Sequence, residues 1–110
     1  MAHYLVQWKL AADNIKNLVQ KPASREDVVR QGMEPFGGKL HQFFFAFGEY
    51  DGALIAEFPD QESCTAFLMM VIAKGGAASF KTTPLITSEE ARKAFQRAGE
   101  TTTTYRPALG

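Results

Sequence analysis

The sequence predicts a single α+β domain, in which helices pack on one face of a small antiparallel sheet. Three observations predict it. Apolar and polar residues alternate through residues 3–10, two more extended segments follow one another within 40–58, and residues 12–35 and 60–74 show helical apolar spacing. Alternation with period two is typical of a strand with two unlike faces, whereas spacings of three and four are typical of a helix. The 110 residues suffice for one hydrophobic core.

The segment at 12–35 predicts a helix in two pieces. Pro22 interrupts it, because the residue before a proline is pushed out of the helical region. Ser24 is then the expected N-cap of the second piece. Arg25 falls in the first turn of that piece, which is a poor place for a cation. We therefore expect Arg25 to pair with a carboxylate or to bind an anionic ligand.

The middle of the chain predicts a hairpin of two strands, 40–47 and 50–58, joined at Gly48 and Glu49. Glu49 is not an ideal turn residue, so we expect Gly48 to adopt a positive φ. The first strand carries three consecutive Phe residues at 43–45, which places Phe on both of its faces. A strand of this kind is expected to be buried on both sides.

The last third of the chain predicts a helix, a strand and a further helix. Asp60 is the expected N-cap of a helix that ends at Gly75. The strand that follows, at 80–86, contains Pro84, which cannot donate to a ladder and so indicates a sheet edge. Thr87 opens the last helix with a capping box.

The predicted order, βαββαβ with an extra C-terminal helix, is the ferredoxin-like arrangement with a four-stranded antiparallel sheet. We expect this domain to cover residues 1–99 and a flexible tail to follow at 100–110. Period-two counting divides the strand residues between two faces. The apolar face under the helices receives Tyr4, Val6, Trp8, Leu54, Ala56, Phe58, Phe80 and Ile86. The mixed face receives His3, Gln7, Asp51, Ile55, Glu57, Lys81 and Leu85.

The face without helices needs a cover, because bare Phe residues on a sheet favour aggregation. Stacking two copies sheet to sheet provides that cover and forms a dimeric α+β barrel. Two-fold dimers are the commonest closed assembly. The sequence therefore predicts a homodimer.

Composition excludes several kinds of partner. Twelve basic residues balance twelve acidic ones, so the surplus of cations that a non-specific nucleic-acid binder needs is missing. No apolar run approaches the roughly 20 residues of a membrane span. The first ten residues include His3, Gln7 and Lys9, where a signal peptide needs an apolar stretch. A single cysteine is typical of a reducing compartment, so we expect a cytoplasmic protein.

The chain resembles the GYD domain family, which is named for a Gly-x-Tyr-Asp element. That element stands here as Gly48-Glu49-Tyr50-Asp51, and the resemblance extends over about residues 3–86. It includes Gly37-Gly38-Lys39, the segment Glu57-Phe58-Pro59-Asp60 and Gly75. The resemblance implies a dimeric ferredoxin-like fold and carries no established activity. Gly48, Tyr50 and Asp51 are its motif residues.

His3, Tyr50 and Asp51 are the candidate catalytic residues. Imidazole changes charge near neutral pH, and His3 could face Asp51 across the sheet, which would orient the imidazole. Tyr50 and Asp51 alternate along a strand, so they cannot both enter one pocket. The alternative is structural, with Asp51 accepting turn amides and Tyr50 packed at the rim.

Trp8, His41 and Arg25 are the candidate ligand-binding residues, because Trp8 could line an apolar pocket between sheet and helices. The wall of this pocket would be completed by Phe67, Phe95 and either Met69 or Met70. The alternative is that these side chains simply pack in the core. Neither histidine belongs to a cluster with metal-ligand spacing, so we predict no metal and no cofactor. Cys64 lies among apolar residues and is expected to be an inert thiol.

Two classes of function remain open. The first is a structural or small-molecule-binding dimer without catalysis. The second is a cofactor-free enzyme like the antibiotic-biosynthesis monooxygenases, which share the architecture but not the motif; this analogy rests on fold alone. An apolar pocket between sheet and helices would favour the enzyme, and a filled core would favour the binding module.

Overall fold

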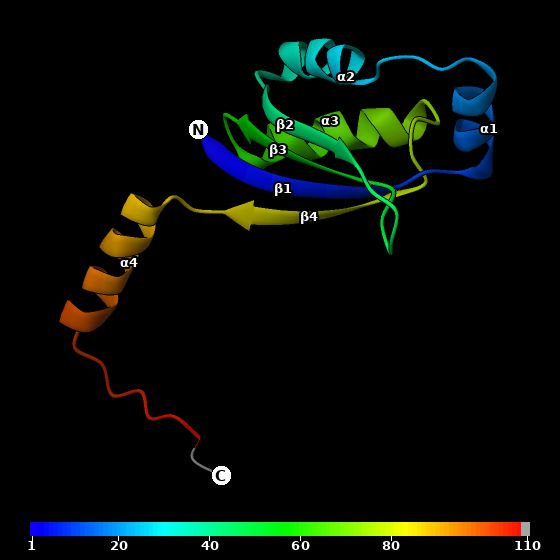
Figure 1. Cartoon of the computed structure of the whole chain (residues 1–110). Coiled ribbons are helices and arrows are strands. Elements are labelled where there is room, and N and C mark those ends of the chain that lie inside the picture. Colours follow the sequence, from blue (N-terminus) through cyan, green and yellow to red (C-terminus); the bar gives the residue numbers. More distant parts are fainter. Residues whose placement is uncertain (109–110) are drawn as a thin grey trace.

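The computed structural model describes residues 1–108, and its four strands form one antiparallel sheet in the order β2-β3-β1-β4 (Figure 1). This is the predicted ferredoxin-like α+β fold. In chain order the elements are β1 (Ala2–Lys9), α1 (Ala12–Gln20), α2 (Glu26–Met33), the 3-10 helix η1 (Glu34–Phe36), β2 (Lys39–Phe45), β3 (Gly52–Phe58), α3 (Gln61–Ala73), β4 (Ser79–Leu85) and α4 (Ser88–Glu100). None of these helices is long and apolar enough to cross a membrane.

The hydrophobic core fills the space between the sheet and the helices α2 and α3. Alternate residues of the two central strands point into it, as the period-two pattern predicts. The ring of Phe58 packs between those of Tyr4 and Phe67, at centroid distances of 6.2 and 5.8 Å. The buried residues are Tyr4, Val6, Trp8, Met33, Leu54, Ala56, Phe58, Cys64, Phe67, Leu68 and Ala77. The sequence places Ile86 on the apolar face, but Ile86 follows the end of β4 and is exposed.

Several predicted helix and strand ends are confirmed. The carboxylate of Asp60 accepts a hydrogen bond from the Ser63 amide at 2.8 Å and caps α3. Thr87 and Glu90 form the predicted capping box of α4. Pro84 lies in β4, which is an edge strand. Ser24 is not the N-cap of α2, because Arg25 occupies that position and no side chain caps the helix there.

The connection between β2 and β3 is longer than the two-residue turn that the sequence predicts. The strands end at Phe45 and resume at Gly52, and the amide of Ala46 donates to the carbonyl of Asp51 at 2.8 Å. Positive φ angles in residues 1–108 occur at Gly37 and Gly75, so the expectation of a positive φ at Gly48 is wrong. A loop of this length can close without a left-handed residue.

The second strand is not buried on both faces within one chain. Phe43 and Phe45 pair with Leu54 and Gly52 and lie on the core side, whereas Phe44 points to the opposite face. Phe44 is 58% exposed. The sequence predicts that a second copy covers this face, and within one chain β2 is an edge strand of the sheet.

Helix α4 projects away from the sheet (Figure 1). It buries no residue, and Phe95 on its apolar side is 76% exposed. The radius of gyration is therefore 17.9 Å, against about 13 Å for a compact domain of this length. A capping box stabilises the first turn of the helix, but within residues 1–108 the helix buries no side chain against another element.

Candidate functional site

The face of the sheet opposite α2 and α3, which we call the open face, is the candidate site. Cross-strand partners share a face, so the register arranges its side chains in rows. The row beside the β2–β3 loop contains Phe44, Ala53, Gln7 and Lys81. The middle row contains Gln42, Ile55, Leu5 and Thr83, and the far row contains Lys39, Glu57, His3 and Leu85. The centre of the face, at Ile55 and Leu5, is thus apolar, and polar groups lie at both ends.

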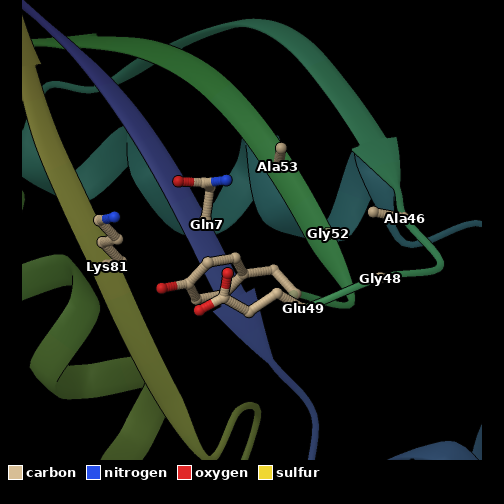
Figure 2. Close-up of a pocket in the computed structure, with 8 residues that line it drawn as sticks. Gln7, Ala46, Gly48, Glu49, Gly52, Ala53 and Lys81 are labelled. Atoms are coloured by element: carbon tan, nitrogen blue, oxygen red, sulfur yellow. The ribbon is translucent and has the colours of Figure 1, made fainter.

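A cleft of about 330 Å³ lies on the open face at the loop end (Figure 2). Figure 2 shows Gln7 on β1 beside Lys81 on β4, and these two residues are cross-strand partners. The cleft is lined by Gln7, Ala46, Gly48, Glu49, Tyr50, Gly52, Ala53 and Lys81. Two motif residues, Gly48 and Tyr50, therefore belong to a cleft that mixes apolar walls with an amide, a carboxylate and an ammonium group.

Asp51, the last motif residue, fastens the loop to the end of β1. Its carboxylate accepts a hydrogen bond from the Leu10 amide at 2.7 Å, and its own amide donates to the carbonyl of Trp8 at 2.8 Å. The predicted pairing of Asp51 with His3 is wrong. The register sets Gly52 opposite Trp8, so Asp51 lies near the C-terminal end of β1, whereas His3 lies near its N-terminal end. The structural alternative for Asp51 fits these contacts.

We expect Asp51→Ala to destabilise the fold by about 2 kcal/mol, because a hydrogen bond to a charged group is lost and the Leu10 amide loses its partner. Urea unfolding monitored by circular dichroism measures this change. Glu49→Ala removes the exposed carboxylate two positions earlier and should stay within about 0.5 kcal/mol of the wild type. Equal midpoints for the two variants would contradict the role assigned to Asp51.

The far row brings both histidines of the chain onto one carboxylate. Nε2 of His3 lies 2.6 Å from Oε1 of Glu57, and Nε2 of His41 lies 3.6 Å from Oε2. The two imidazole rings stack at a centroid distance of 6.0 Å and an angle of 18°. Nδ1 of His3 is buried and has no hydrogen-bond partner within residues 1–108. Glu57 is therefore the carboxylate that both imidazoles approach.

Glu57 is the site residue that the sequence reasoning missed. The expectation that neither histidine belongs to a ligand cluster is also wrong, because Glu57 holds both of them. Sequence spacing could not show this: His3, His41 and Glu57 come from three strands, and β2 has a register shift between Leu40 and Gln42. The available signal was Glu57 on the same predicted face as His3.

The other predicted ligand-binding residues do not form a pocket. Trp8 is buried and packs on Phe43 and Phe45, at centroid distances of 5.2 and 6.4 Å. Phe95 lies on the projecting α4 and Met69 is exposed, so the expected wall around Trp8 does not form. Arg25 has no ion pair in the described part of the chain, and the expected carboxylate partner is not found.

Cys64 is buried in the core, and burial raises the pKa of its thiol to about 11. The thiolate is the reactive form, so its population near pH 8 is about 100-fold lower than for a thiol with the ordinary value. We expect native protein to react with a thiol reagent about 100-fold more slowly than urea-unfolded protein at the same pH. Equal rates would contradict the burial of Cys64.

The fold and the open face define a class: small ferredoxin-like α+β domains with one uncovered sheet face. The profile of the GYD domain family matches residues 4–95, and the chain belongs to this family. No match was found among the curated proteins. A crystal structure of a hypothetical protein from Pyrococcus horikoshii is similar in fold, with a TM-score of 0.50 and 16% identity. The alignment covers 82% of this chain and 95% of that one.

Proposed function

We propose that this chain is a non-catalytic, small-molecule-binding module that acts as a homodimer, with the open faces of two copies stacked. The observation that carries the proposal is the mixture of apolar and polar side chains on an uncovered sheet face. Phe44 is exposed there, and Leu5, Ile55 and Leu85 are half-buried. Contiguous exposed apolar surface of this kind marks an interaction site.

A second copy is the occupant that the chain itself favours. The formal net charge of the chain is zero, so two copies do not repel one another through excess charge. A two-fold stack also pairs each apolar middle row with an identical row. Helix α4 supports the same partner, because an amphipathic helix of 13 residues is marginal alone in water. The second copy offers surface to both the sheet and the helix.

The ligand would occupy the cleft beside the β2–β3 loop. Small-molecule sites combine apolar walls with a few polar groups, and this cleft offers alanine and glycine walls with Gln7, Glu49, Tyr50 and Lys81. We infer a small, mainly apolar ligand with an anionic or hydrogen-bonding group near Lys81. The lone, buried Cys64 is consistent with the cytoplasm as the compartment.

A filled core favours this binding module over the monooxygenase-like alternative. Two clefts are found within residues 1–108: one lies on the open face and the other is lined by α3 residues. Neither lies between sheet and helices, where the enzyme would need its pocket. Fully buried side chains such as Phe58 and Met33 lie in that space.

The dye 1-anilinonaphthalene-8-sulfonate is a suitable probe, because it combines flat apolar rings with an anion. We expect its fluorescence to rise and saturate with wild-type protein, and Lys81→Ala to weaken its binding about tenfold. Lys74→Ala, which removes an exposed lysine at the end of α3, is the matched control and should bind as the wild type does. No saturable signal, or equal affinity in both variants, would contradict the proposed cleft.

A further inference from the structure

We propose that His3, His41 and Glu57 form a binding site for one divalent transition-metal ion, such as Zn²⁺. The three side chains each offer one ligand atom, and these atoms all lie within 4.8 Å of one another. Imidazole nitrogen and carboxylate oxygen are the ligands that such ions share. The inference goes beyond the proposed function and does not depend on it, because all three ligands come from one chain.

The distances fit one ion with small adjustments. Zinc binds imidazole nitrogen and carboxylate oxygen at about 2.0–2.2 Å in tetrahedral geometry, so two ligand atoms of one ion lie roughly 3.4 Å apart. Nε2 of His3 and Nε2 of His41 already approach the same carboxylate, one at each oxygen. Side-chain rotations of His41 and Glu57 within the present register would bring the three atoms to one centre.

The backbone holds the ligands in place before the ion binds. His3 and Glu57 are direct cross-strand partners on the two central strands, which are the best-supported part of the sheet. His41 occupies the register shift of β2, which redirects its side chain toward Glu57. Lys39 faces Glu57 in the register, but the ion pairs of Glu57 are with the two histidines.

In the single chain the site is partly covered and keeps a side open for a further ligand. The side chains of Glu57, His3 and His41 are 19%, 27% and 44% exposed. Three protein ligands with an accessible fourth position are typical of reactive zinc sites, whereas structural sites use four protein ligands. An ion here could therefore take water or an anionic group of a small molecule as its remaining ligand.

Calorimetric titration of untagged, chelator-treated protein with ZnCl₂ tests the proposal. We expect one Zn²⁺ per chain, with Glu57→Gln weakening the affinity about tenfold or more. Glu62→Gln, which neutralises an exposed carboxylate on α3, is the matched control and should leave the affinity unchanged. A circular dichroism spectrum like that of the wild type will show that Glu57→Gln is folded.

Proton NMR of the imidazoles is the second readout, since the chain has two histidines and both are ligands in the proposal. Addition of Zn²⁺ should shift the ring signals of His3 and His41 together, with saturation at one equivalent. The proposal is overturned if no heat is released up to about 1 mM Zn²⁺. It is equally overturned if only one ring responds, or if Glu57→Gln binds as tightly as Glu62→Gln; the histidines and Glu57 would then form only an ion-pair network.

Discussion

Gly52→Ala is expected to destabilise the fold by about 3 kcal/mol, the largest stability loss expected from adding one methyl group to this chain. Gly52 begins β3 opposite Trp8, and a Cβ at this position would overlap the indole ring. The indole cannot retreat freely, because Trp8 is packed on Phe43 and Phe45. The urea midpoint of unfolding, followed by circular dichroism, measures the loss.

Gly48→Ala is the matched control for Gly52→Ala. A Cβ on Gly48 would meet no atom within 4 Å, and its φ is not positive. We therefore expect the free energy of unfolding to change by no more than about 0.5 kcal/mol, although Gly48 is the glycine of the Gly-x-Tyr-Asp motif. Equal destabilisation by the two substitutions would contradict this explanation, in which position 52 requires glycine because the Trp8 ring lies so close.

Phe44→Lys is expected to separate the two copies of the proposed dimer. Phe44 is the most exposed large apolar side chain of the open face, and an aromatic contact buried in an interface is worth about 2 kcal/mol. Its loss from each copy weakens association about 30-fold per copy, and each lysine would place a charge on the proposed interface. Sedimentation velocity over a dilution series measures the dissociation constant.

Met69→Lys provides the comparison for Phe44→Lys. Met69 is 65% exposed but lies on α3, on the other side of the sheet. This variant should associate as the wild type does. If both variants keep the wild-type dissociation constant, the open face is not the interface.

Local patterns in the sequence predicted the elements and their order. Period two in β1 identified the buried face with Tyr4, Val6 and Trp8, and the carboxylate of Asp60 marked the start of α3. These signals are local, because each depends on backbone geometry within a few residues. The fold class followed from their order.

The site could not be predicted in the same way, because it depends on register between strands. A loop of 46–51 in place of a two-residue turn moved Asp51 out of β3 and away from the His3 end of the sheet. The shift in β2 then brought His41 to Glu57, which no spacing along the chain reveals. The projecting course of α4 was equally hidden, since its apolar stripe indicates a partner but not which one.

The central claim is that the open face is covered by a second copy, and the molar mass in solution tests it most directly. Light scattering on the purified chain at about 10 µM should give twice the chain mass of 12.2 kDa. A constant mass of 12.2 kDa up to about 100 µM would contradict the claim.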